Sequence, residues 1–292
     1  MNRTNILLLF LSLAPILLFA QSSKVYDNLS MTSKILDMER KYAVYLPPSY
    51  ESSERSYPVL YLLHGAGDDQ TGWVQFGEIQ HILDKAIKAG KATPMIVIMP
   101  DADTKVRGYF NSPDNKWRYE DFFFEELMPH VEQKFRIKGE KRFRAVAGLS
   151  MGGGGSFMYA LHRPDLFSSA CPLSASTGPL TLEDAKKWVE WINKDKTAYS
   201  EAEMQAWFEK YSTTEYLKNN EVPKEWNTKV RWFIDCGDDD FLFEGNSLVH
   251  IAMRKKEIEH EFRIRNGGHN WTYWRASLPV VLNFVSDAFH QY

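Results

Sequence analysis

Short apolar runs alternate with stretches of helical periodicity along most of this 292-residue chain. Two of the runs, residues 59–63 and 96–99, are continuously hydrophobic, as expected for strands buried on both faces. Strands that alternate with helices build βαβ units, so the pattern predicts one doubly wound α/β domain with a mostly parallel sheet. The predicted strands are 42–46, 59–63, 95–99, 143–149, 167–173, 230–236 and 261–265, and the predicted helices are 79–89, 121–135, 156–162, 247–258 and 278–289.

The alternation is interrupted between residues 177 and 229, where polar helical stretches replace a short connection. Insertions in an α/β sheet lie on loops, and those beyond the carboxyl ends of strands cover the ligand crevice. We interpret this segment as a cap-like insertion within a single domain of residues 21–292. The alternative is that its tryptophans only pack it against the rest of the domain, which is the commoner use of aromatic side chains. These tryptophans are Trp188, Trp191, Trp207 and Trp226.

The first twenty residues have the pattern of a secretory signal peptide. Arg3 supplies a positive charge, and an apolar run over residues 6–19 ends at Ala20, so that cleavage is expected before Gln21. The run is shorter than a comfortable bilayer span, which disfavours the alternative of an uncleaved anchor. The mature protein is expected to be soluble and exported, either secreted or periplasmic.

Composition and charge exclude several classes of protein. With 44% apolar and 25% charged residues, the chain is neither disordered nor collagen-like nor a polytopic membrane protein. Its formal net charge of -3 creates no field that recruits nucleic acid or an anionic membrane. Two cysteines, Cys171 and Cys236, are too few for a disulfide framework and lack the ligand spacing of a zinc site. We therefore expect a neutral or small partner.

Residues 148–152 read Gly-Leu-Ser-Met-Gly and stand between a predicted strand and a glycine-rich helix start. This is the G-x-S-x-G pattern in the context of a nucleophile elbow, which presents Ser150 on a tight turn. Gly148 and Gly152 fit that turn because a Cβ at either position would collide with adjacent backbone. One alternative is a phosphate-binding loop, but neither G-x-G-x-x-G nor G-x-x-x-x-G-K-[ST] can be placed here. The other is a purely structural glycine turn.

A serine nucleophile needs a base to take its proton and an acid to orient that base. In folds that carry a nucleophile elbow, the catalytic residues follow one another along the chain in the order Ser, acid, His. His269 is the histidine after Ser150 that stands in a loop following a predicted strand. We expect His269 to act as general base and acid. The acid is expected after strand 230–236, where Asp238, Asp239 and Asp240 are adjacent and spacing does not choose among them. A metal site is the alternative, but no nearby histidine or spaced carboxylate completes its coordination shell.

The oxyanion donors are assigned by position. The loop after strand 59–63 reads His64-Gly65-Ala66-Gly67, and on this scaffold it supplies one backbone amide while the residue after the nucleophile supplies the other. The expected donors are the N–H groups of Ala66 and Met151, each worth roughly 3 kcal/mol at comparable sites. His64 itself is interpreted as a structural loop residue.

Together these motifs resemble the esterase D-like branch of the α/β hydrolases, and most of all the secreted bacterial feruloyl esterases of carbohydrate esterase family one. The resemblance covers residues 26–292 and implies the α/β-hydrolase fold, a mostly parallel central sheet with helices on both faces, and no cofactor. It also singles out Asp240, because the family's acid lies three positions after the glycine that closes the strand. The matching segments are 61–65, 71–73, 148–153, 236–242 and 267–269 with Trp271.

The resemblance implies a substrate as well, since feruloyl esterases cut ester links between hydroxycinnamic acids and arabinose on xylan. Aromatic walls suit a planar phenolic group, and the candidates in predicted loops are Trp271 and Trp117, with Tyr109, Phe110, Tyr273 and Trp274. The alternatives are an acetyl xylan or general carbohydrate esterase, a sugar acyltransferase and a non-catalytic carbohydrate-binding protein. The related S-formylglutathione hydrolases are cytosolic thioesterases, and the predicted export signal argues against that branch.

Overall fold

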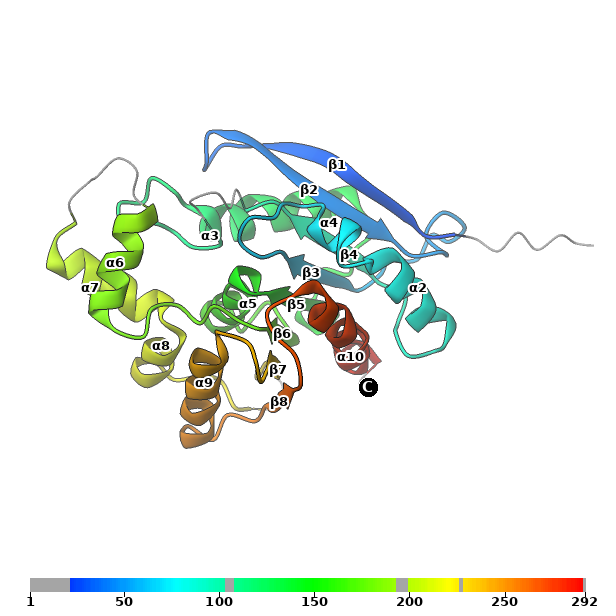
Figure 1. Ribbon diagram of the computed structural model, residues 1–292. Coiled ribbons are helices and arrows are strands. Elements are labelled where there is room, and N and C mark those ends of the chain that lie inside the picture. The colour runs from blue at the N-terminus through cyan, green and yellow to red at the C-terminus, as the bar shows by residue number, and fades with distance from the viewer. Residues whose placement is uncertain (1–21, 103–107, 193–198, 226–227, 291–292) are drawn as a thin grey trace, which may run out of the picture.

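The computed structural model describes residues 22–102, 108–192, 199–225 and 228–290. Its centre is one eight-stranded sheet with the strand order β1-β2-β4-β3-β5-β6-β7-β8 (Figure 1). The predicted signal peptide lies outside the described residues. The strands are β1 (Lys24–Ser33), β2 (Met38–Leu46), β3 (Val59–Leu63), β4 (Ile96–Pro100), β5 (Arg144–Leu149), β6 (Ser169–Leu173), β7 (Arg231–Gly237) and β8 (Glu261–Arg265).

The sheet is parallel from β4 to β8 and antiparallel at its β1 end. β3 pairs in parallel with both β4 and β5, and the parallel pairing continues through β6, β7 and β8. β1 and β2 form an antiparallel hairpin whose second strand pairs with β4. The mostly parallel sheet is confirmed, but β1 was not predicted. Its sequence, KVYDNLSMTS, is polar and largely exposed at the sheet edge, so it lacks the apolar run that marks the inner strands.

Helices cover both faces of the sheet. Alternate residues of β3 enter different cores: Val59, Tyr61 and Leu63 join one cluster, while Leu60 and Leu62 join the other. The first cluster includes α5 (Met151–His162), the turns from α3 (Tyr119–Asp121) to α4 (Met128–Lys134), and α9 (Phe243–Lys255). The second includes α2 (Ile79–Lys88) and α10 (Trp271–His290), with the short α1 (Gly72–Gln75) beside them. Figure 1 shows α2 and α10 on the opposite side of the sheet from α5 and α9.

Three predicted helix starts are wrong, and one predicted helix is interrupted. Helix α9 runs from Phe243 to Lys255 rather than over the predicted residues 247–258. Helix α10 begins at Trp271 rather than at residue 278, because its buried face continues across Pro279, a residue that usually breaks a helix. Tyr273 and Trp274 therefore lie on a helix and not in a loop. Helix α5 begins at Met151 rather than residue 156, despite a glycine run of low helix propensity. Between α3 and α4, the predicted helix 121–135 contains a π-helical turn, η1 (Phe122–Leu127).

The described residues of the insertion between β6 and β7 form three helices, α6 (Leu182–Ile192), α7 (Glu201–Tyr211) and α8 (Thr213–Asn219), which lie together beyond α5 (Figure 1). Trp207 is buried, and its indole N–H donates to the Asn111 carbonyl at 2.8 Å. The rings of Trp188 and Trp207 both contact Phe110, with centroids 5.4 and 5.6 Å away. These two tryptophans therefore do pack the insertion against the domain. Trp226 and the side chain of Trp191 lie outside the described residues.

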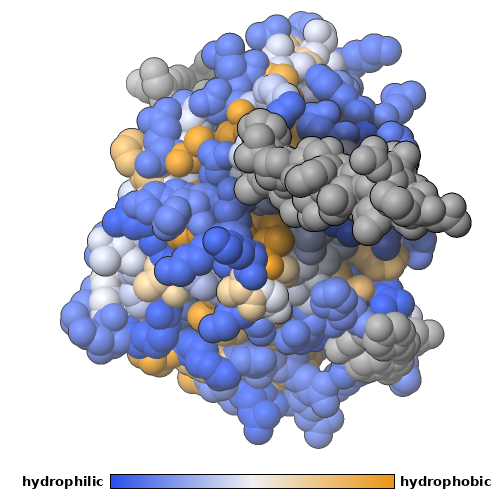
Figure 2. All heavy atoms as spheres, turned by 90° about the vertical axis from the view of Figure 1, so that its right-hand side faces the viewer, coloured by the Kyte–Doolittle hydropathy of each residue, from blue (hydrophilic) through white to orange (hydrophobic). Residues whose placement is uncertain are grey.

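The surface and the thiols agree with a chain held together by packing. Figure 2 shows a largely hydrophilic face on the α2 and α10 side, with apolar residues in small separate groups. Within the described ranges, no helix is both long and apolar enough to cross a bilayer.

Cys171 on β6 and Cys236 on β7 are buried free thiols, and burial raises the pKa of Cys236 to about 12.

Candidate active site

Ser150 stands on a strained turn between β5 and α5. Its φ of 54° lies in the left-handed region, which a residue with a side chain rarely adopts. Three backbone hydrogen bonds hold it there. The Ser150 N–H donates to Leu173 O at 2.9 Å, and its carbonyl accepts from the N–H groups of Gly154 at 3.0 Å and Ser176 at 2.8 Å. The strain is thus supported by β6, the loop after β6 and the first turn of α5.

The glycines around Ser150 leave no room for a side chain. A Cβ built on Gly148 would lie 2.4 Å from Gly152 O, and one on Gly152 would lie 2.5 Å from Leu63 O. Beyond the turn, a Cβ on Gly154 would lie 2.1 Å from Ser176 O. All three contacts are with backbone, which does not yield as the tip of a flexible side chain does. The glycine pattern therefore records how closely α5 approaches β3 and the loop after β6.

Three loops at the carboxyl ends of β5, β7 and β8 bring together Ser150, Asp240 and His269. His269 Nε2 lies 2.9 Å from Ser150 Oγ, and His269 Nδ1 lies 2.9 and 3.0 Å from the two carboxylate oxygens of Asp240. Parallel strands end at one edge of the sheet, so residues far apart in sequence meet there. This geometry lets the imidazole take a proton from Ser150 while the carboxylate fixes its tautomer.

The structure separates the three adjacent aspartates by their contacts. Asp238 and Asp239 are exposed, and an oxygen of Asp238 accepts from the Gly267 N–H at 2.9 Å. Asp240 is buried and also accepts from the Leu242 N–H at 2.9 Å. Burial alone would raise the pKa of Asp240, but hydrogen bonds from His269, Leu242 and Ser174 together lower it. Asp240 is therefore held as an anion beside His269, a choice that spacing in the sequence left open.

A second buried carboxylate anchors the loop that carries His269. Asp235 on β7 is fully buried, accepts a hydrogen bond from the Tyr273 hydroxyl at 2.5 Å and forms an ion pair with Arg265 at the end of β8. The Arg265 guanidinium also donates to Ser277 at 2.5 Å. Because Tyr273 and Ser277 lie on α10, these bonds hold the residues on both sides of the 266–270 loop. This support did not emerge from the sequence, since its members are separated by up to about forty positions.

The loop after β3 lies against the nucleophile. A Cβ on Gly65 would lie 3.3 Å from the Cβ of Ser150, and Met151 is the first residue of α5. The roles of Ala66, the residue after Gly65, and of Met151 as oxyanion donors stay predictions. His64 is buried, and its Nε2 accepts from the Ala102 N–H at 3.1 Å while Nδ1 lies 2.9 Å from Gly65 O. The Nδ1–H tautomer satisfies both bonds, and burial lowers the pKa of His64, favouring its neutral form. His64 thus ties the loop to backbone, as a structural residue would.

The two tryptophans predicted to contact substrate have different surroundings. Trp117 is buried in the first core cluster, and its indole N–H donates to Gly108 O at 2.8 Å, so it faces core rather than the site. Trp271 is partly buried at the start of α10 and contacts Trp274 at a centroid distance of 5.3 Å. Trp274 in turn meets the ring of His269 edge-on at 4.9 Å. The prediction for Trp117 does not fit its burial, while Trp271 lies near the site.

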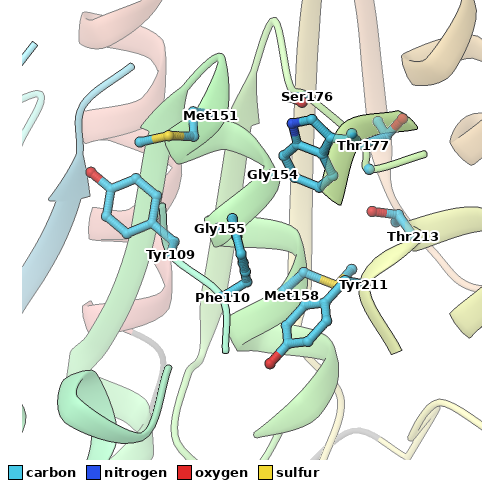
Figure 3. Close-up of a pocket in the computed structure, with 12 residues that line it drawn as sticks. Tyr109, Phe110, Met151, Gly154, Gly155, Met158, Ser176, Thr177, Tyr211 and Thr213 are labelled. Atoms are coloured by element: carbon cyan, nitrogen blue, oxygen red, sulfur yellow. The ribbon is translucent and has the colours of Figure 1, made fainter. Parts of the chain in front are cut away.

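A pocket opens beside the elbow, between α5 and the insertion. It contains about 410 Å³ of space, part of it open to solvent. Figure 3 shows Met151 and Tyr109 near the start of α5 and Met158 with Tyr211 further along the helix. The insertion contributes Trp188 and Thr213, residues that sequence reasoning did not assign to a pocket. The lining residues are Tyr109, Phe110, Met151, Gly154, Gly155, Met158, Ser176, Thr177, Gly178, Trp188, Tyr211 and Thr213.

The site also contains an aromatic residue that the sequence analysis did not single out. Phe241 directly follows Asp240, its side chain is 71% exposed, and its ring lies 4.5 Å from the ring of His269. Its position next to the predicted acid is the signal that points to it. As for metals, the described residues contain no group of three or more His, Cys, Asp or Glu side chains placed to hold an ion.

Comparison with known proteins identifies a family that spans most of the chain. The family model named Esterase matches residues 33–285. A solved ferulic acid esterase is 35% identical with a TM-score of 0.78, and the match covers 92% of this chain and 99% of that one. This similarity confirms the predicted α/β-hydrolase fold and the predicted resemblance to feruloyl esterases.

Curated relatives carry several different names. An endo-1,4-beta-xylanase/feruloyl esterase of Xylanibacter ruminicola is 36% identical over 49% of this chain and 20% of its own length. An S-formylglutathione hydrolase of Bos taurus is 25% identical, with 92% of each chain covered. The chain spans 32% of the length of two mycobacterial esterases that it also matches. The names agree on ester or thioester hydrolysis and differ in the acyl group and the leaving group.

Proposed function

The chain belongs to the Esterase family of carboxylic ester hydrolases, and from that premise we propose that it is a secreted serine esterase that hydrolyses feruloyl esters of plant cell-wall xylan. The observation that carries the proposal is the chain of short contacts from Ser150 Oγ through His269 to Asp240. The solved ferulic acid esterase, similar over nearly its whole length, supports the choice of acyl group.

The mechanism follows from the contacts around Ser150. Its hydroxyl attacks the ester carbonyl while His269 Nε2 accepts the proton, and the buried Asp240 carboxylate stabilises the imidazolium that forms. The backbone N–H groups of Ala66 and Met151 bind the oxyanion. His269 then gives its proton to the leaving alcohol, takes one from a water molecule, and the acyl-enzyme is hydrolysed to release the acid. The residues of this chain carry every step without a cofactor.

The pocket beside α5 is the proposed site for the acyl group. It reaches the elbow at Met151 and at Ser176, whose N–H donates to the Ser150 carbonyl. Its walls are mostly apolar and include the rings of Phe110, Trp188 and Tyr211, as suits a planar phenolic acid. In this view the 177–229 insertion supplies one wall of the acyl site, and the chain from residue 21 onward acts as a single domain.

A panel of esters tests the acyl assignment. Methyl ferulate and other methyl hydroxycinnamates are expected to have a higher kcat/KM than acetyl esters, because the acetyl group leaves the pocket unfilled. Trp188→Ala should lower that preference by about 3- to 10-fold, the loss expected for one aromatic contact. A higher kcat/KM for acetylated xylan would instead support an acetyl xylan esterase, and transfer to a sugar in preference to water would support an acyltransferase.

The second candidate is S-formylglutathione hydrolysis, which the bovine relative favours, since it is 25% identical and the match covers 92% of each chain. S-formylglutathione, a thioester, should be included in the panel at the same concentrations as the other substrates.

The predicted N-terminal signal argues for export, and N-terminal sequencing of the protein recovered from the periplasm or medium tests it. A mature protein that begins at Gln21 is expected, whereas an intact Met1 in the cytoplasm would contradict both the signal and the substrate.

A further inference from the structure

Four aromatic rings form a series of contacts that includes His269, and we call Phe241, Trp274, Trp271 and Phe76 the aromatic row. The centroid of the Phe241 ring lies 4.5 Å from that of His269, and the centroid of Trp274 lies 4.9 Å from it. The contacts continue from Trp274 to Trp271 at 5.3 Å and from Trp271 to Phe76 at 5.9 Å. The row is therefore continuous with the proposed catalytic site and joins the loop after β7, helix α10 and the segment after α1.

The two ends of the row are open to water. Phe241 is 71% exposed and Phe76 is 49% exposed, although each carries a large apolar ring. The inner members are more enclosed: Trp274 is buried and donates from its indole N–H to Ser174 Oγ at 3.1 Å, and Trp271 packs edge-on against the buried Trp73. Exposed aromatic rings on a rigid aromatic base are a feature of binding surfaces rather than of cores.

The chemistry of His269 decides which part of the substrate lies here. The imidazole that accepts the serine proton later protonates the leaving oxygen, so the alcohol must lie within hydrogen-bond reach of Nε2. The alcohol side of the ester is therefore beside His269, and the acyl side is in the pocket lined by Met151 and Trp188. We propose that the aromatic row is the alcohol-side subsite, on which the sugar residues of the esterified polysaccharide stack.

Polar groups at both ends of the row fit a neutral polyol. Asp239 is exposed two positions before Phe241. At the other end, Arg275 donates to the Phe76 carbonyl at 2.7 Å and lies 3.7 Å from Glu78. Carboxylate and guanidinium groups around apolar rings provide acceptors and donors for hydroxyls, while the rings contact the C–H faces of a sugar. A sugar residue bonded to the ester matches this surface in both respects.

This subsite rests on the proposed function, which assigns the ester that is bound. Two substrates that share one acyl group but differ in the alcohol distinguish a failure of the subsite from a failure of the proposed function. Methyl ferulate and a feruloylated arabinoxylo-oligosaccharide differ only in the alcohol. In Phe241→Ala, the ratio of kcat/KM for the oligosaccharide to that for methyl ferulate should fall about 3- to 10-fold, mainly through KM. Phe76→Ala should give a smaller fall that grows with the length of the oligosaccharide. Tyr26→Ala, which removes an exposed ring that is not a member of the row from the edge strand β1, should leave the ratio unchanged.

Direct binding provides the second measurement. Ser150→Ala should bind an arabinoxylo-oligosaccharide without a feruloyl group, and adding Phe241→Ala should weaken that binding by a similar factor. Equal losses on both esters in Phe241→Ala, or no loss at all, would overturn the subsite. If the wild type fails to cleave methyl ferulate while the Ser150→Ala protein still binds the oligosaccharide, the acyl assignment is wrong and the subsite stands. Thermal melting of each variant checks that the fold is retained.

Discussion

The elbow and the insertion border the same pocket, but they are held in place by different kinds of contact. At the elbow, Gly148 and Gly152 approach carbonyl oxygens so closely that any Cβ would collide with them. In the helices of the insertion, Trp188 and Trp207 pack their rings on the ring of Phe110, which is a contact between side chains. Backbone contacts admit one residue type, whereas side-chain contacts tolerate repacking. On the proposed function, the chemistry is thus built on the rigid part, and the choice of substrate on the adjustable part.

A buried charge cluster joins the insertion to the rest of the domain. The carboxylate of Glu120 is buried and lies 2.5 Å from His162 Nδ1, 2.6 Å from the Tyr211 hydroxyl and 2.9 Å from Lys210 Nζ. His162 Nε2 lies 3.1 Å from the Lys210 carbonyl, so both ring nitrogens face acceptors, the pattern of an imidazolium. Burial would raise the pKa of Glu120, but these partners, His162 foremost, lower it to about 2.

The contrast predicts that changes at the elbow and its partners remove activity, and the largest effect is expected for Ser150→Ala. It deletes the attacking oxygen, so kcat should fall about 10⁶-fold, as for other enzymes of this mechanism. Turnover of methyl ferulate is the measurement, with labelling by a fluorophosphonate as an independent readout. Ser168→Ala, which removes a hydroxyl bonded to Arg144 O outside the elbow, is the matched control. Retained turnover in Ser150→Ala would remove the nucleophile from the proposal.

Asp240→Asn should have the next largest effect, a loss of about 10⁴-fold in kcat, because an amide no longer selects the imidazole tautomer that accepts the serine proton. Turnover of methyl ferulate, which carries no sugar, is the measurement. Asp238→Asn and Asp239→Asn provide controls two and one positions away, since it is Asp240 whose carboxylate hydrogen-bonds His269. A comparable loss in either control would mean that the charge of the loop matters more than one oriented carboxylate.

Gly152→Ala tests the backbone side of the comparison. The added Cβ would lie 2.5 Å from Leu63 O and 2.6 Å from His64 O, so α5 must move away from the proposed oxyanion loop. We expect destabilisation of about 1–3 kcal/mol and a loss of roughly 10²-fold in kcat. Gly139→Ala is the matched control, since its nearest neighbour is the tip of Glu132 at 3.1 Å. Near-normal activity in Gly152→Ala would show that the elbow repacks as freely as the insertion.

Glu120→Gln tests the side-chain side and should affect stability more than catalysis. It leaves His162 and Lys210 without their buried counter-ion, so unfolding should become easier by about 3–5 kcal/mol at neutral pH. Because the pKa of Glu120 is lowered from 4.5 to about 2, the contribution is fully present above about pH 4.5 and disappears as pH falls toward 2. Thermal melting of the wild type and of Glu120→Gln across this pH range should therefore give melting temperatures that converge in acid. Glu183→Gln, which breaks the exposed ion pair with Lys187, is the control. A difference in stability between wild type and Glu120→Gln that does not depend on pH would contradict the role given to the Glu120 carboxylate.

The sequence predicted the turn around Ser150 better than it predicted contacts between residues of different strands and helices. The parallel strands and the turn around Ser150 could be read from local patterns, since buried strands and tight turns each demand particular residue types within a few positions. The helix boundaries were less certain, because Pro279 and the glycine run weaken local helical signals that tertiary packing overrides. β1 escaped prediction because an edge strand that pairs with β2 requires no apolar run.

By itself the sequence determined the fold class, the strained serine turn and the one histidine in a loop of suitable order, because each is specified by short-range steric and periodic demands. Spacing left the choice among three adjacent aspartates open, the family resemblance pointed to Asp240, and the structure brings its carboxylate against His269. Only the tertiary structure decided that Trp117 lies in the core while Phe241 lies beside His269, and that the insertion lines a pocket beside Met151. Those outcomes depend on contacts between residues tens of positions apart. Their distances are set by how the helices pack on the sheet, which no local pattern encodes.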